Sequence, residues 1–140
     1  IPPITYERVY KLKEKFSDLQ IVINGEISTI EECLAHLEKV DGVMMGREAY
    51  DNPYLLKDVD NIIFAKNKKV KNRKEILLDY LPYLESEYQN KTKLVHATKH
   101  LMGLFKGLKG AKEIRKFLTR IDSIENPIEQ YKKLSLRFQE

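Results

Sequence analysis

Cysteine is nearly missing from this sequence: Cys33 is the only one in 140 residues, which excludes an intrachain disulfide framework. That scarcity is typical of a reducing compartment, so we expect the protein in the cytoplasm. No apolar run approaches the roughly 20 residues that a membrane-spanning helix needs, and we expect a soluble chain with no membrane partner. The start, Ile1-Pro2-Pro3, contains neither an initiator methionine nor a signal-peptide pattern. We therefore expect a piece of a longer protein.

Acidic residues are scarce over 91–120, where nine lysines and arginines stand against the single acid Glu113. The net charge of this segment is +8, whereas that of the whole chain is +4. An ordinary solvated lysine surface is interspersed with acids, so the block favours contact with a nucleic-acid backbone. The basic residues fall opposite the apolar faces of two expected helices. The candidate contacts are Lys99, Lys112, Arg115 and Lys116.

Two short apolar strands are predicted, over 19–23 and 42–45, and each is followed by a glycine loop and a helix. Backbone N–H groups of such loops can face an anion, and an arginine beside them can pair with it. Two loops of this kind at the carboxyl ends of neighbouring parallel strands hold a cofactor phosphate after strands seven and eight of a (β/α)8 barrel. The predicted phosphate site consists of Asn24, Gly25, Glu26, Gly46 and Arg47.

The expected fold is mostly α: the last two β/α units of a TIM barrel, an α/β remnant, followed by an all-α helical bundle. A complete barrel needs about 250 residues, more than this chain has. Ahead of the first strand, Val9, Leu12 and Phe16 predict one face of a helix over 5–16. Ser28 and Glu31 predict a capping box at the start of the helix between the strands.

Strand signals vanish after residue 47, and helices are predicted over 73–89, 92–106 and 111–121. A last helix begins at Asn126, with Asn126 as its cap and Pro127 in the first turn. Four helices on short loops form a small bundle. We therefore divide the chain into a barrel region over 1–56, a connector over 57–72 and a helical domain over 73–140.

Complete catalytic or metal-binding groups are not evident in the sequence. Cys33 lies on the apolar stripe of its helix, which is the normal place for an inert, buried cysteine. His96 and His100 form an i, i+4 pair that lacks a third ligand, so we expect no metal site. Glu48 and Asp51 face no evident acid–base partner. We expect no catalytic residue in this chain.

Two sequence blocks are specific enough to indicate a family. One runs from Gly46 to Pro53 (GREAYDNP) and the other from His100 to Phe105 (HLMGLF). Together with Ile23-Asn24-Gly25-Glu26-Ile27, they closely resemble the A-type tRNA-dihydrouridine synthases. The resemblance extends over nearly the whole chain.

This resemblance implies a flavoprotein with an FMN-binding barrel and a C-terminal helical domain that binds tRNA. In that family hydride passes from NADPH to FMN and then to a uracil ring flipped out of the D-loop. Glu26 departs from the glycine that is usual at the third position of the first loop. The family's catalytic cysteine, flavin-binding lysine and histidine belong to segments before this chain begins. The resemblance implies FMN-phosphate contacts for Asn24, Gly25, Glu26, Gly46 and Arg47, and tRNA contacts for Lys112 and Arg115.

Two alternatives stay open at this point. A stand-alone helical RNA-binding module would bind tRNA without FMN, whereas a fragment of another FMN-barrel oxidoreductase would explain the glycine loops but not the basic block.

A partial barrel also leaves unpaired strand edges, so we expect the fragment to be a homo-oligomer. The apolar face expected to be exposed consists of Ile21, Ile23, Val43 and Met45.

Overall fold

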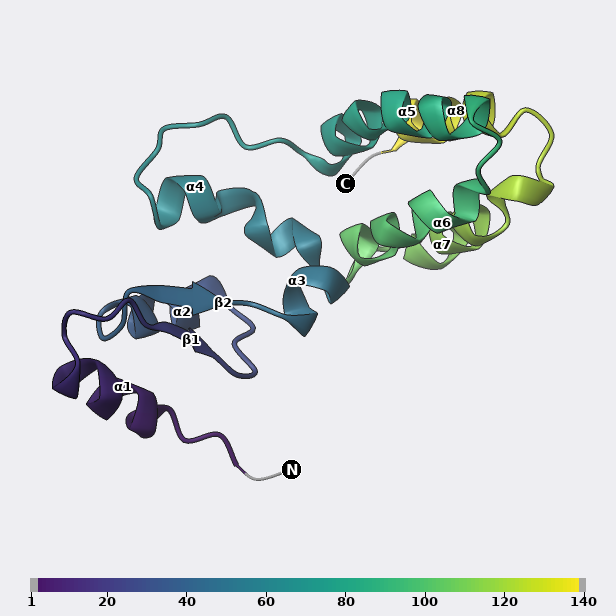
Figure 1. The fold of residues 1–140 in the computed structure, drawn as a ribbon. Coiled ribbons are helices and arrows are strands. Elements are labelled where there is room, and N and C mark those ends of the chain that lie inside the picture. Colours follow the sequence, from purple (N-terminus) through teal and green to yellow (C-terminus); the bar gives the residue numbers. More distant parts are fainter. Residues whose placement is uncertain (1–2, 139–140) are drawn as a thin grey trace.

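The computed structural model describes residues 3–138, which form two regions that meet beside α3 (Figure 1). The N-terminal region contains two strands, β1 (Val22–Asn24) and β2 (Gly42–Met44), and two helices, α1 (Tyr6–Lys15) and α2 (Ile30–Leu37). The described residues from α3 onward form helical elements and the loops that connect them. The described chain is therefore mostly α with a small sheet, as the sequence predicts.

β1 and β2 are parallel, with Val22 opposite Gly42 and Asn24 opposite Met44. The pairing begins at Asp41, whose N–H donates to the Ile21 carbonyl at 3.1 Å and whose carboxylate accepts from the Ile21 N–H at 2.8 Å. Because α2 connects the strands, they form the predicted β-α-β unit. Parallel strands end at the same edge of a sheet, so the two glycine loops lie side by side.

The sheet is covered on the side that we expected to be exposed, so that prediction was wrong. Ile23 is only 1% exposed, whereas Val22 and Met44, on the other side, are 61% and 47% exposed. The helices α1 and α2 supply the cover, as side chains from both pack in the same cluster as Ile23. The residues on the covered side are Ile21, Ile23, Val43 and Met45.

The helix α1 makes fewer apolar contacts than its sequence predicts. Val9 packs against the cluster under the sheet, but Leu12 and Phe16 are 47% and 43% exposed. Tyr6 and Tyr10 take part in the packing instead. The apolar face that the sequence predicts for this helix is therefore only partly buried, and Phe16 lies just past its end.

The capping box of α2 lies one residue later than predicted. Thr29, rather than Ser28, is the N-cap, and its hydroxyl accepts from the Glu32 N–H at 3.1 Å. The Glu32 carboxylate accepts in return from the Thr29 N–H at 3.1 Å and from the Ser28 N–H at 2.8 Å. These hydrogen bonds hold the pKa of Glu32 below its ordinary value, and the bond from the Ser28 N–H has the largest effect. Glu31 takes no part in them.

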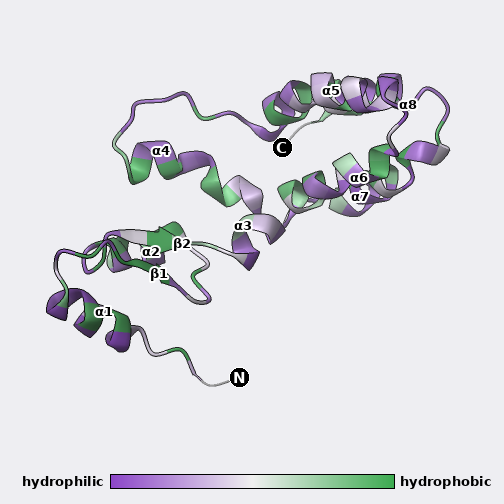
Figure 2. Cartoon of the chain, viewed as in Figure 1, coloured by the Kyte–Doolittle hydropathy of each residue, from purple (hydrophilic) through white to green (hydrophobic). Residues whose placement is uncertain are grey.

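Helical turns extend into the segment that we expected to be a connector. After α3 (Arg47–Asp51) come the 3₁₀ helix η1 (Pro53–Asp58) and the single turn α4 (Val59–Ile62). The part of this segment without helical turns spans residues 63–72. Figure 2 shows that much of this connection is hydrophilic.

The helical region contains α5 (Arg73–Gln89), α6 (Leu94–Thr98), α7 (Ala111–Thr119) and α8 (Pro127–Arg137). The single helix predicted over 92–106 is two elements, since the 3₁₀ helix η2 (Lys99–Phe105) follows α6. α7 ends two residues early, and η3 (Ile121–Ser123) follows it. Asn126 is not the predicted side-chain cap: its backbone is left-handed, with φ of 52°, and it makes no capping hydrogen bond.

Side-chain hydrogen bonds connect the helices of this region to one another. The Tyr131 hydroxyl on α8 donates to the Leu77 carbonyl on α5 at 3.0 Å, and Tyr131 is fully buried. Asp122 in η3 accepts from the Leu94 and Val95 N–H groups at 2.7 and 3.1 Å, so a residue distant in sequence caps α6. Through these bonds the helical region becomes a single packed unit.

The two regions meet where η2 crosses α3 and η1, and the contact requires glycine at position 103. A Cβ atom there would lie 2.6 Å from the Tyr50 carbonyl oxygen, 2.8 Å from that of Asp51 and 2.7 Å from Pro53 Cδ. Lys106, just after η2, also pairs with Glu48 on α3 at 2.9 Å. The two blocks that indicate the family in the sequence therefore contact each other.

We expect Gly103→Ala to destabilise the protein by about 2–3 kcal/mol, because the added methyl group meets main-chain and ring atoms that cannot rotate away. The matched control is Gly107→Ala, where nothing lies within 4 Å of the added Cβ and φ is +78°. That control should cost only about 1 kcal/mol, the strain of a left-handed alanine. Urea denaturation measures both, and equal losses would contradict the close contact at Gly103.

We expect the isolated chain to self-associate through the exposed side of its two-stranded sheet, because Val22 and Met44 present apolar surface there and exposed apolar patches recruit partners. Val22→Lys combined with Met44→Lys should shift the protein toward monomer. Leu136→Lys is the control, since Leu136 is 50% exposed but lies on α8. Light scattering over a range of concentrations measures the change. A wild-type chain that stays monomeric at every concentration would refute the expectation.

Candidate functional site

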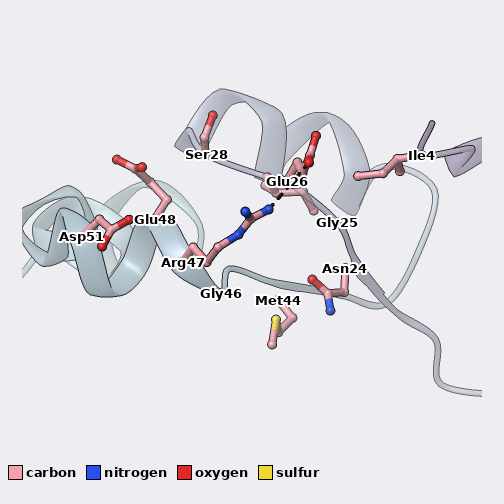
Figure 3. Close-up of a pocket in the computed structure, with 11 residues that line it drawn as sticks. Ile4, Asn24, Gly25, Glu26, Ser28, Met44, Gly46, Arg47, Glu48 and Asp51 are labelled. Atoms are coloured by element: carbon pink, nitrogen blue, oxygen red, sulfur yellow. Dashed lines mark ion pairs between the residues drawn. The ribbon is translucent and has the colours of Figure 1, made fainter. Parts of the chain in front are cut away.

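An open cavity of about 630 Å3 lies at the edge of the sheet where both strands end (Figure 3). It is lined from both glycine loops, from the start of α3 and from the segment before α1. All five residues predicted to form the phosphate site line it: Asn24, Gly25, Glu26, Gly46 and Arg47. The structure therefore brings the two loops together around one space.

The first loop requires glycine at position 25. Gly25 has φ of +138°, which side chains rarely adopt, and an added Cβ would lie 3.1 Å from Ile4 Cδ1. The Tyr6 hydroxyl donates to the Gly25 carbonyl, which fixes this turn against α1. The next residue, Glu26, has a left-handed backbone with φ of 49°. Glycine at position 26 would adopt that conformation without strain.

The second loop contributes Arg47, the only arginine or lysine among the described residues that lines the cavity. Arg47 begins α3, and its Nη2 lies 3.6 Å from Glu26 Oε1 across the cavity (Figure 3). Both side chains are mostly exposed, 83% for Arg47 and 65% for Glu26, so the pair contributes little to stability. α3 has only five residues, so Arg47, rather than a helix dipole, is the main source of positive charge. In this structure the Glu26 carboxylate lies beside the Arg47 guanidinium, the group with which a bound anion would pair.

Glu48 and Asp51 also line the cavity, although sequence reasoning gave them no role. The hydrogen bond from Lys106 is the main reason that the pKa of Glu48 is below its ordinary value, with a smaller contribution from Asn52. Glu48 is therefore an ionised carboxylate whose charge Lys106 balances. Sequence spacing could not have shown this, since 58 residues separate the two partners.

The predicted RNA-contacting residues lie on the helical region. Lys112, Arg115 and Lys116 come from α7, and Lys99 begins η2. All four are exposed, and no ion pair occupies any of them within residues 3–138. Arg115 Nε donates to the Met102 carbonyl at 3.3 Å, which holds its guanidinium against η2. The basic surface is thus free to contact an anionic partner.

Cys33 and the histidines do not form a reactive centre. Cys33 is 3% exposed, as predicted for a buried cysteine, and burial raises the pKa of its thiol. His36 shares a hydrogen bond with the Tyr10 hydroxyl at 2.6 Å and is buried between helices. Over the described residues no three His, Cys, Asp or Glu side chains are grouped to hold a metal ion.

None of the described helices is long and apolar enough to cross a membrane.

Comparison with known families gives a match over residues 1–139 to the family described as dihydrouridine synthase (Dus). The chain belongs to the dihydrouridine synthase family. It is 45% identical to a tRNA-dihydrouridine(20/20a) synthase of Vibrio parahaemolyticus over 119 residues, 85% of this chain and 36% of that protein. The enzyme of the same name from Pseudomonas putida is 46% identical over 119 residues, which are 85% of this chain and 35% of the relative. The chain thus spans about a third of the length of these relatives.

If the cavity holds a phosphate, Glu26→Gln should raise affinity for FMN by roughly three- to tenfold, because it removes a negative charge beside the anion. Affinity for riboflavin, which lacks the phosphate, should not change. Glu31→Gln is the matched control, since Glu31 is exposed on α2 and does not line the cavity. Quenching of flavin fluorescence measures each affinity. An equal change for both flavins would place the phosphate elsewhere.

Proposed function

We propose that this chain is the C-terminal section of an A-type tRNA-dihydrouridine synthase, an FMN-dependent oxidoreductase that reduces D-loop uridine to dihydrouridine with NADPH. The observation that carries the proposal is the 45% identity to synthases named for positions 20 and 20a, over 85% of this chain. The section supplies the phosphate end of the flavin site and the tRNA-binding helices. The alternative of a different FMN-barrel oxidoreductase leaves the basic surface without a role.

The β-α-β unit fits the last two units of a TIM barrel. Its strands are parallel and have helices on one side only, which is how barrel strands meet their outer layer. Val22 and Met44 are on the other side, which in a closed barrel is the interior. Their exposure here supports a missing set of strands, supplied by the N-terminal barrel segment of the whole protein.

The residues of the cavity fit the phosphate group of FMN. Gly25 leaves room that a Cβ would fill, and Arg47 presents a guanidinium suited to bidentate pairing with phosphate oxygens. Asn24 and Gly46 complete the two loops. FMN would supply the hydride-transfer chemistry, while these residues would anchor and orient its phosphate end. The catalytic groups belong to the rest of the protein, and the whole would act in the cytoplasm.

We expect the isolated chain to bind FMN weakly and to purify with little flavin, because it contains the phosphate end of the site and no groups for the ring system. Absorbance in the flavin band after purification, followed by titration with FMN, measures this. A stoichiometric yellow complex would show that the cavity is misassigned.

We expect Lys112→Ala and Arg115→Ala each to weaken tRNA binding and to lower the slope of log affinity against log salt by about one. Each change removes a cation that displaces one counterion from the RNA backbone. Lys11→Ala, on exposed α1, is the control and should leave both quantities unchanged. Circular dichroism checks the fold. Unchanged affinity in both α7 variants would contradict the proposed tRNA surface.

A further inference from the structure

A groove of about 570 Å3 lies between α7 and α8, and none of the residues that line it lines the proposed flavin cavity. Its volume lies in the range of about 300–1,000 Å3 that is typical of pockets for small organic groups. Its inner surface is apolar and half-buried, with Ile114, Phe117, Leu134 and Phe138. None of these four was assigned a functional role by the sequence.

Positive charge surrounds this apolar surface. Lys109, Lys133 and Arg137 line the groove and are exposed, and no acidic residue of the described chain lines it. Lys133 pairs with Glu129 at 2.6 Å, whereas Lys109 and Arg137 form no ion pair within residues 3–138. Two free cations therefore lie beside an aromatic and aliphatic surface. This combination matches a ligand with an apolar face and an anionic backbone.

An unpaired nucleotide of RNA has that combination, because a base offers a flat π-face and its phosphates carry the charge. A paired base would leave the groove empty, since its faces are stacked inside the duplex. We propose that the α7–α8 groove binds an unpaired base of RNA, with Phe117 contacting the base and with Lys109 and Arg137 contacting the flanking phosphates. The proposal rests on the proposed tRNA-binding function and adds a second contact to it.

The groove is distinct from the basic face already assigned to tRNA. Lys112 and Lys116 are on α7 but do not line the groove. Those two lysines can contact phosphates of any RNA, paired or unpaired. The groove should instead discriminate between unpaired and paired RNA. This difference makes the two surfaces separable by experiment.

The test compares binding of the chain to an unstructured single-stranded 24-nucleotide RNA and to a blunt 12-base-pair RNA duplex of nearly equal charge, by fluorescence anisotropy at fixed salt. We expect the wild-type chain to bind the single strand roughly five- to tenfold more tightly, from the stacking of one base. Lys109→Gln combined with Arg137→Gln, and separately Phe117→Leu, should abolish that preference. Lys132→Gln, which removes a cation of α8 outside the groove, is the control and should retain it.

The outcomes separate this inference from the function on which it rests. Groove variants that bind both RNAs as the wild type does, or that lose affinity for both equally, would overturn the groove as a base site. Lys112→Ala should weaken binding to both RNAs and leave their ratio unchanged. A wild-type chain that binds tRNA but neither of these RNAs would overturn the groove as a base site, whereas one that also fails to bind tRNA would overturn the proposed tRNA-binding role of the helices. Competition by an acidic peptide but not by single-stranded RNA would overturn the base site by assigning the groove to a protein partner.

Discussion

The close approach of the η2 backbone to α3 and η1 at Gly103 determines how the two regions of the chain are oriented. This approach requires glycine, because a Cβ atom at position 103 would overlap the Tyr50 and Asp51 carbonyl oxygens and the Pro53 ring. The Glu48–Lys106 pair adds a polar contact beside it. Since α3 also carries Arg47, this contact links the direction of the basic surface to the cavity at the ends of the two strands.

The two glutamates of the cavity each have a nearby cation. Glu48 is paired with Lys106, and Glu26 lies beside Arg47 (Figure 3). The Glu48–Lys106 pair lies at the junction of the two regions. There the charge of Lys106 balances the charge of the Glu48 carboxylate, which lines the cavity. The second pair lines the cavity, so an anion that entered it would have to compete with Glu26 for the guanidinium. Glu26 thus combines a left-handed backbone with a carboxylate beside Arg47.

Local signals in the sequence predicted the elements well, but their details depended on contacts between distant residues. The β-α-β unit and the helical region follow from apolar periodicity. The capping box, a local feature, was misplaced by one residue, because Glu32 rather than Glu31 returns the hydrogen bond, to the N–H of Thr29. The segment predicted as one helix over 92–106 is divided: η2 is pressed against α3, and Asp122 from η3 caps the start of α6. Neither contact could be inferred from spacing.

The sequence by itself determined the family, the glycine loops and the basic block, because each is a local pattern of residue types. Only the tertiary structure decided which face of the sheet is covered, because period-two alternation cannot tell which side the helices pack against. It also decided that Glu26 faces Arg47, that Lys106 balances Glu48, and that α7 and α8 border a groove. These depend on the relative placement of segments far apart in the chain, which is a property of packing.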